Sequence, residues 1–281
     1  MTRHGFGRSV TLYRRHAKSL RASEDSEPRY PDDASNHPSA DKVATFVSSG
    51  ISAPALREWT IAGLHEALID RIKHLPELSA ETPILDIGCG TGAWLDRLAA
   101  NGFKVLHGVD RKTGKFATRR ATFSQVDLDT TPDLGFRNRT FGLITAIEVV
   151  EHLENPGRLF FHVAKHLSDN GVFLMTTPNI HSIHSRLRFL LTGNLKEFDP
   201  KGDPTHLYPV LVTSLHKILH RYELGIVNQF SYPSDGGTRN SRWSLRMAAS
   251  ILGLVLPAIA SGDILCFMIQ RTQQQHSCNN G

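Results

Sequence analysis

The sequence predicts an α/β protein in which parallel strands are joined by helices, and three observations lead to this prediction. First, short apolar runs with the length of buried strands recur at residues 84–87, 103–109, 121–126, 141–147 and 172–176. Second, helical or turn-forming segments separate these runs, as in right-handed crossover connections. Third, two further stretches that look like strands follow at residues 223–231 and 264–271.

Helices are expected around these strands. Apolar residues, Trp59 among them, recur at helical spacing between residues 54 and 75, with charged residues between them, which predicts an amphipathic helix before the first strand. Residues 94–98 continue the same spacing after that strand. The pair Asn155-Pro156 has the pattern of a helix start, with Asn as the cap and Pro at the first helical position. Residues 181–222, rich in Arg, Leu and His, predict a helical insertion that covers the substrate.

The composition fits one domain between two polar tails. Of the 281 residues 40% are apolar and 21% charged, which is enough to bury a full core. Residues 1–45 and 273–281 hold few apolar side chains, so we expect disordered tails there and a domain over residues 46–272. The longest nearly uncharged apolar run, Met247–Ala260, is shorter than the roughly 20 residues of a membrane-spanning helix.

The charge distribution argues against a nucleic-acid-binding surface. The net charge is +5, but residues 1–22 hold six basic side chains and no acid, which leaves 26 basic and 27 acidic side chains elsewhere. We therefore expect no DNA partner and do not favour RNA. The three cysteines have neither disulfide nor zinc-ligand spacing, which favours a cytoplasmic location. The Arg-rich start also resembles a mitochondrial transit peptide, so a mitochondrial location is the alternative.

The segment Ile84–Gly92 is the predicted cofactor-binding turn. An apolar strand that contains one carboxylate, Asp86, runs into three alternate glycines, which let the backbone turn tightly and approach a ligand. Gly88, Gly90 and Gly92 and the strand before them resemble motif I of the class I S-adenosylmethionine (SAM) dependent methyltransferases. The resemblance implies a Rossmann-like fold, namely a seven-stranded, mostly parallel sheet with helices on both faces.

A dinucleotide-binding fold is the rival interpretation. Gly88, Gly90 and Ala93 also satisfy the looser G-x-G-x-x-G/A pattern, and Asp110 lies where a ribose-binding acid belongs. A pyrophosphate would be repelled by the carboxylate of Asp86. SAM has no phosphate and carries an ammonium and a sulfonium group. Asp86 therefore favours SAM.

The resemblance also implies how the cofactor is held. Asp110, at the tip of the second strand, would accept both ribose hydroxyls. Asp127, after the third strand, would receive the adenine amino group, although Asp129 is close enough to do the same. The predicted cofactor-binding residues are Asp86, Gly88, Gly90, Gly92, Asp110, Asp127, Leu128 and Ile147.

The stretch Glu148–Leu153 is the second informative segment. It resembles the E-V-x-E-H segment of the ubiquinone-biosynthesis O-methyltransferases and, more distantly, that of the small-RNA 2'-O-methyltransferases. Those families usually have an acid after the preceding phenylalanine, where this chain has Gly142.

Glu148, Glu151 and His152 stand at i, i+3 and i+4, so one helical turn would place them on one face. Two hard oxygens and one nitrogen suit Mg²⁺ or Mn²⁺. In the competing interpretations Glu151 complements a helix N-terminus, His152 lines the site or is the general base, or the set is structural. His206, 54 residues after His152, has a separation similar to that of the fourth ligand of the small-RNA enzymes, but a solvated loop histidine is the simpler alternative.

We therefore expect a SAM-dependent methyltransferase that O-methylates a small or lipophilic hydroxyl acceptor, with Glu148 and His152 as catalytic residues. The alternatives are an RNA 2'-O-methyltransferase, a non-catalytic SAM-binding module and a nicotinamide-dependent oxidoreductase. The apolar segment Trp243–Ala260 lies close to Arg239, Arg242 and Arg246. It predicts either ordinary core or a weak peripheral contact with an anionic membrane.

Overall fold

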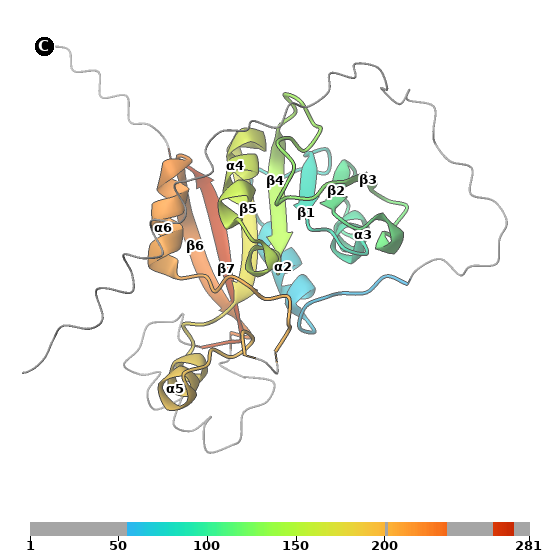
Figure 1. The fold of residues 1–281 in the computed structure, drawn as a ribbon. Coiled ribbons are helices and arrows are strands. Elements are labelled where there is room, and N and C mark those ends of the chain that lie inside the picture. The colour runs from blue at the N-terminus through green and yellow to red at the C-terminus, as the bar shows by residue number, and fades with distance from the viewer. Residues whose placement is uncertain (1–54, 200–201, 235–260, 273–281) are drawn as a thin grey trace, which may run out of the picture. The chain divides into compact units, whose positions relative to one another are not determined.

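The computed structural model describes residues 55–199, 202–234 and 261–272 (Figure 1). A seven-stranded sheet has the strand order β3-β2-β1-β4-β5-β7-β6. The strands are β1 (Ile84–Ile87), β2 (Leu106–Asp110), β3 (Thr122–Gln125), β4 (Phe141–Ile147), β5 (Leu167–Pro178), β6 (Leu224–Tyr232) and β7 (Ile264–Arg271). Strands β1 to β5 pair in parallel, and β7 pairs antiparallel with β5 and β6. The predicted sheet is confirmed.

Helices cover both faces of this sheet, as predicted. They are α2 (Leu64–Ile72), α3 (Ala93–Ala100), α4 (Pro156–His166), α5 (Ile183–Thr192) and α6 (Val212–Arg221), with short 3₁₀ turns η1 (Thr113–Lys115) and η2 (Val150–His152). Apolar residues of α2 and α3 form one core cluster with one side of the strands. Those of α4 and α6 form a second cluster with the other side. The strand order reverses between β1 and β4, which is where ligands bind in sheets of this kind.

The helix predicted over residues 54–75 is wrong in its first half. Helix α2 begins only at Leu64, and residues 55–63, which we call the strap, have no regular structure. Gly63 causes the break, since its φ is +84° and a Cβ there would lie 2.3 Å from Tyr232 Oη. Trp59, placed on the buried face of the predicted helix, is instead 54% exposed.

Two smaller predictions also change. Helix α4 begins at Pro156 as expected, but the Asn155 side chain makes no capping hydrogen bond. Only part of the predicted insertion over residues 181–222 stands apart from the sheet, because α6 contacts β6 and buries Leu215 and Leu219 in the core.

The departure at Gly142 has a steric cause. A Cβ at this position would lie 2.5 Å from Thr82 Cγ2, so the acid found in the resembling families would require the Thr82 side chain to move.

Within the described residues no helix is both long and apolar enough to cross a membrane. The apolar segment Met247–Ala260, Arg239, Arg242, Arg246 and the two predicted tails lie outside these residues.

Candidate active site

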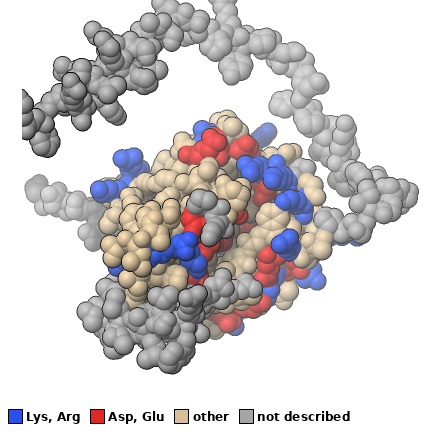
Figure 2. All heavy atoms as spheres, turned by 60° about the horizontal axis from the view of Figure 1, so that its bottom comes forward, with Lys and Arg blue, Asp and Glu red and all other residues tan. Residues whose placement is uncertain are grey.

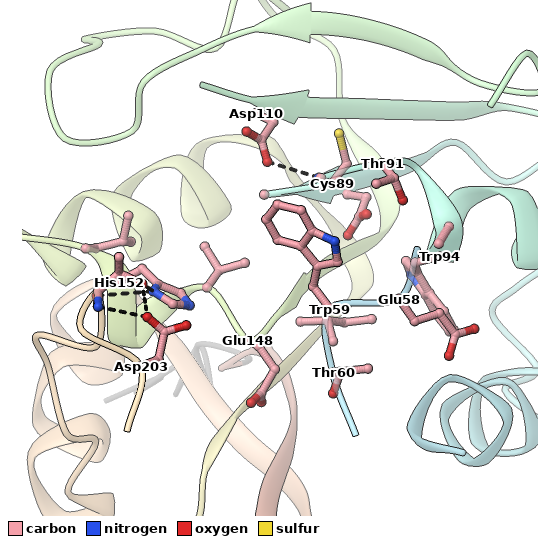
Figure 3. A pocket seen from close by; sticks show the side chains of 18 of the residues that line it. Glu58, Trp59, Thr60, Cys89, Thr91, Trp94, Asp110, Glu148, His152 and Asp203 are labelled. Carbon is pink, nitrogen blue, oxygen red and sulfur yellow. Dashed lines mark hydrogen bonds between the residues drawn. The ribbon is translucent and has the colours of Figure 1, made fainter. Parts of the chain in front are cut away.

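One cavity opens at the carboxyl ends of β1, β2 and β4 (Figure 3). The glycine turn, the ends of these strands and residues 127–129 form one half of its lining, which we call the cofactor half. The other half, which we call the acceptor half, is lined by Glu148, Val149, His152, Leu153, Asp203, Thr205 and His206. Glu151 belongs to the same segment but is fully buried and does not line the cavity itself. The strap contributes to the lining as well. All the predicted cofactor residues except Gly92 line this one space, together with His152 and His206.

The three glycines of the turn have different roles. All have positive φ, of 75° at Gly88, 53° at Gly90 and 82° at Gly92. A Cβ at Gly88 would lie 2.5 Å from Val149 Cγ2, and one at Gly92 would lie 2.5 Å from Thr118 Cγ2. A Cβ at Gly90 would meet no atom within 4 Å. Gly90 therefore borders the open space in which a ligand can approach the backbone.

Asp86 is buried in the cavity wall at the end of β1. The Thr145 hydroxyl donates to its Oδ1 at 2.6 Å, and Trp94 Nε1 donates to Thr145 Oγ1 at 3.2 Å. Burial raises the pKa of Asp86 to about 7, the negative charge of Asp110 adds to this effect, and the Thr145 hydrogen bond opposes it. A cation that enters the cavity would favour the ionised form.

Asp110 is held by two backbone amides. Gly90 N donates to Oδ2 at 3.0 Å, and Lys112 N donates to Oδ1 at 2.9 Å. The carboxylate is thus fixed at the mouth of the cavity, and each oxygen keeps a second lone pair for a ligand hydroxyl.

The structure does not distinguish Asp127 from Asp129 as the acceptor for the adenine amino group. Both line the cavity. Asp127 Oδ1 accepts from Asp129 N at 3.0 Å, and Asp129 Oδ1 accepts from Asn155 N at 3.0 Å. Leu128, which is buried, and Ile147 supply apolar surface to the same wall.

The shared helical face of Glu148, Glu151 and His152 is a wrong prediction. Glu148 has a φ of +53°, so the chain turns sharply after β4, and η2 is a single 3₁₀ turn that starts at Val150. Thr176 holds Glu148 instead, because its Oγ1 accepts from Glu148 N and donates to Glu148 Oε1, both at 3.0 Å. Burial raises the Glu148 pKa to about 7 against the opposing Thr176 bond, and the nearby Glu197 charge adds to it.

Glu151, His152 and His206 come together in a different way. One ligand atom of each lies within 4.8 Å of those of the other two. The Glu151 carbonyl accepts from Leu207 N at 2.7 Å and from Tyr208 N at 2.9 Å. These two bonds fasten the loop that carries His206 to η2. Glu148 does not belong to this group of three, which we call the triad.

The two histidines of the triad have matching hydrogen bonds. His152 Nδ1 lies 3.2 Å from Thr205 O, and His206 Nδ1 lies 2.9 Å from Glu197 O. Thr205 Oγ1 also lies 2.9 Å from His152 Nδ1, and its hydrogen is donated to Asp203 Oδ1 at 2.6 Å. A carbonyl oxygen only accepts, so both Nδ1 atoms carry a proton, and in the neutral imidazole Nε2 keeps a lone pair. Metal-binding histidines are oriented in this way. Burial lowers the His152 pKa, and the neighbouring His206 adds to this, which favours neutral imidazole.

Glu151 completes the case for a cation. Its side chain is fully buried, and neither carboxylate oxygen has a hydrogen bond of ordinary geometry among the described residues. Burial and the charge of Glu148 raise its pKa well above the usual range, and weaker interactions with its own backbone amide and the Thr177 hydroxyl oppose this rise. A buried carboxylate without partners is costly, and a bound metal ion would remove that cost.

The donor set changes the metal that we expect. The sequence predicted Glu148, Glu151 and His152 as ligands, with His206 as a tentative fourth, whereas the triad lacks Glu148 and offers one carboxylate and two imidazoles. Imidazole nitrogens suit first-row transition metals, and Mg²⁺ prefers oxygen ligands. Of the two ions predicted, the triad therefore fits Mn²⁺ better than Mg²⁺.

Sequence reasoning missed several residues of the cavity. Thr145, Thr176 and Thr205 orient the acidic and imidazole side chains through bonds that join distant segments. No local pattern marks them. Trp59 was misplaced because its spacing matched the helix predicted around it.

A sheet of this order, with a glycine turn after β1 and acids at the ends of β1 and β2, defines a methyltransferase of the Rossmann-like class. Residues 61–229 match the family model described as "Methyltransferase domain". The chain belongs to this family. It is thus a SAM-dependent methyltransferase, and the alternatives of an oxidoreductase and a non-catalytic module are set aside.

Individual relatives are more distant. A ubiquinone biosynthesis O-methyltransferase of Nitrobacter winogradskyi is 30% identical over 172 residues, which are 58% of this chain and 63% of that protein. One of Rickettsia typhi is 29% identical over 120 residues, 41% of this chain and 48% of that protein. The chain thus matches about half to two thirds of their length. A solved SAM-dependent methyltransferase of Mesorhizobium loti has 19% identity and a TM-score of 0.47, over 74% of this chain and 99% of that one.

The cavity suits the cofactor that the family implies. The space beside Gly90 would admit the cofactor against the backbone, and Asp110 could accept its ribose hydroxyls. Asp86 could complement its positive charge. The residue assignments themselves rest on this fit.

Proposed function

We propose that the protein transfers the methyl group of SAM to a hydroxyl oxygen of a small or lipophilic acceptor, with the help of a divalent metal ion held by Glu151, His152 and His206. The observation that carries this proposal is the triad. A buried carboxylate without partners stands beside two imidazoles whose Nε2 lone pairs are available. The relatives named ubiquinone biosynthesis O-methyltransferase support an oxygen acceptor.

In this reaction the main task of the protein is to position the cofactor and the acceptor. SAM supplies an activated methyl group. The acceptor oxygen forms a bond to the methyl carbon while the carbon–sulfur bond breaks and its electron pair stays on sulfur. Asp110 and the glycine turn would fix the cofactor, and the acceptor half would hold the oxygen in line behind the methyl carbon.

The acceptor proton must leave during this step. A metal ion at the triad would lower the pKa of the acceptor hydroxyl and orient its oxygen. Without a metal, His152 Nε2 would be the base, because its Nδ1 proton is already bonded to Thr205 O. Glu148, which Thr176 holds at the cavity wall, is the second candidate base.

RNA 2'-O-methylation is the second candidate function, supported by the resemblance of the Glu148–Leu153 segment. The surface gives it less support. On the face drawn in Figure 2, basic and acidic side chains lie side by side rather than in a continuous basic patch. A protein that tracks a phosphate backbone needs such a patch.

Helix α5 offers a reason to favour a lipophilic acceptor. Its last turn exposes Phe189, Leu190 and Leu191, with exposed fractions of 53%, 79% and 80%. Adjacent exposed apolar side chains of this size are typical of surfaces that contact a partner or a lipid layer. We propose that this end of α5 rests weakly on a membrane that holds the acceptor, at the cytoplasmic side or, in the alternative, in the mitochondrion.

The test is a turnover assay with labelled SAM and a panel of acceptors: catechols and phenols with and without an alkyl chain, sugars, and a short RNA with free 3'-terminal hydroxyls. We expect transfer to a phenolic oxygen. Exhaustive chelation should lower turnover at least about 100-fold, and Mn²⁺ should restore it.

The control is His216→Ala, which changes an exposed histidine of α6 outside the cavity and should behave as the wild type. If turnover survives chelation in full and is lost in His152→Ala, the metal-assisted mechanism is wrong and His152 acts as a general base. If the methyl group is transferred only to RNA, the proposed small or lipophilic acceptor is wrong and the protein is an RNA methyltransferase.

A further inference from the structure

The strap is fixed to the cofactor half of the cavity on both sides of Trp59. Arg57 N donates to Thr91 Oγ1 at 3.1 Å, and the Thr91 hydroxyl donates back to Arg57 O at 2.9 Å. Beyond Trp59, Tyr232 Oη donates to Ala62 O at 3.0 Å. Thr91 belongs to the glycine turn itself. The strap is therefore attached directly to the segment that would hold the cofactor.

The neighbouring Glu58 anchors the strap to two helices. Its carboxylate binds Arg97 of α3 and lies 3.2 Å from His65 Nδ1 of α2. Glu58 also lines the cavity, but its carboxylate is held at the wall by these two helices. Figure 3 shows the Trp59 ring directed into the cavity, between the labelled Asp110 and Glu148.

Trp59 has no core role in this position. The side chain is 54% exposed although it lines the cavity. One face of its ring carries the Lys115 ammonium, 3.8 Å from the ring centroid. An indole face is the best aromatic surface for a cation. Trp59 thus presents a cation-binding surface inside the cavity that would hold a cationic cofactor.

We propose that Trp59 is a cofactor-binding residue whose ring stabilises the positive sulfonium of SAM, so that the protein prefers SAM over S-adenosylhomocysteine. This inference rests on the proposed placement of SAM in the cavity. Methyl transfer removes the sulfonium charge, because the sulfur keeps the electron pair of the broken bond. The contact with Trp59 is then lost, which favours exchange of the product for fresh SAM.

Lys115 gives the proposal a second consequence. Its ammonium would repel the sulfonium at the same ring, so SAM must displace it. Lys115 ends the short turn η1 and has a flexible side chain that can swing into solvent. Removal of this ammonium should therefore strengthen the preference for SAM.

The experiment is calorimetric titration of the full chain with SAM and with S-adenosylhomocysteine, for the wild type, Trp59→Leu, Trp59→Phe and Lys115→Met. A cation–π contact predicts that Trp59→Leu loses about tenfold in SAM affinity and no more than about twofold in S-adenosylhomocysteine affinity. Trp59→Phe should lie between the two. Lys115→Met should raise the SAM preference by about twofold to fivefold.

Two outcomes separate the failure of this inference from that of the cofactor assignment. If the wild type binds both ligands and Trp59→Leu weakens both equally, or neither, the ring does not recognise the charge. If the wild type binds neither ligand, the cofactor assignment fails and the inference fails with it. Trp59→Phe and Lys115→Met keep the test valid if Trp59→Leu does not fold, which thermal melting would reveal.

Discussion

The cofactor half and the acceptor half of the cavity are built in different ways. In the cofactor half, the acids are already partnered: Asp86 by Thr145, and Asp110 by the amides of Gly90 and Lys112. Beside the acceptor half, Glu151 is fully buried, and neither of its carboxylate oxygens has a hydrogen bond of ordinary geometry among the described residues. The acids of the first half are therefore held in place before a ligand enters, whereas the buried carboxylate of Glu151 would gain from the cation that we propose for the second half.

The two halves also differ in how the chain assembles them. The glycine turn and Asp110 sit at the ends of adjacent parallel strands, so the sheet alone brings them together. His206 reaches the triad through a loop that two backbone bonds to the Glu151 carbonyl fasten in place. If this division is right, a substitution in one half should leave ligand binding in the other half intact.

The largest effect within the cofactor half is expected for Asp110→Asn. The change replaces one acceptor oxygen by a donor that faces a backbone amide, and it removes the charge that would strengthen both ribose bonds. We expect SAM affinity to fall on the order of 100-fold in calorimetry. Metal affinity should stay within about twofold of the wild type. A parallel loss of metal binding would show that the halves are not separate. Asp70→Asn, an exposed change on α2, is the control.

Asp86→Asn should weaken SAM binding but stabilise the cofactor-free protein at high pH. Burial raises the folded-state pKa of Asp86 to about 7, above the unfolded value of about 3.9. The stability that the protonated group contributes is therefore present below pH 3.9 and is lost as the pH rises towards 7. Asparagine keeps the acceptor for Thr145 and never ionises.

We expect cofactor-free Asp86→Asn to be more stable than the wild type at pH 8, by at most about 4 kcal/mol, and to match it near pH 4. Denaturant titration at several pH values measures this difference. SAM affinity at pH 8 should be lower in the variant. A wild type that is the more stable protein at pH 8 would contradict the raised pKa.

The smallest effect is expected at α5, outside both halves. The double variant Leu190→Ser/Leu191→Ser removes two exposed apolar side chains and should reduce flotation with anionic liposomes severalfold, with turnover on tailless acceptors unchanged. Val227→Ser, a similarly exposed position on β6, is the matched control. If the wild type, the double variant and Val227→Ser float equally, or if none floats at any ionic strength, the proposed membrane contact of α5 is wrong.

The contrast between the halves also explains what the sequence could predict. Strands β1 and β4 begin and end where predicted, because continuous apolar runs mark strands that are buried on both faces. Asp86 and Asp110 could be predicted because they stand at the ends of such strands. The positive φ of Glu148 and the break at Gly63 could not, since both depend on contacts with Thr176 and Tyr232, far away in the sequence.

The roles of His152, His206 and Glu151 as ligands remain predictions, although the structure brings the three together. The membrane segment predicted at Trp243–Ala260 also remains a prediction, and it lies outside the described residues.

The most direct test of the central claim is a Mn²⁺ titration of the SAM-saturated protein, followed by electron paramagnetic resonance, for the wild type, Glu151→Gln, His206→Ala and Glu148→Gln. The account predicts one Mn²⁺ per chain, with affinity at least about 100-fold weaker in Glu151→Gln and His206→Ala and within about threefold of the wild type in Glu148→Gln. Unchanged Mn²⁺ binding in His206→Ala, with loss of binding in Glu148→Gln, would contradict the triad.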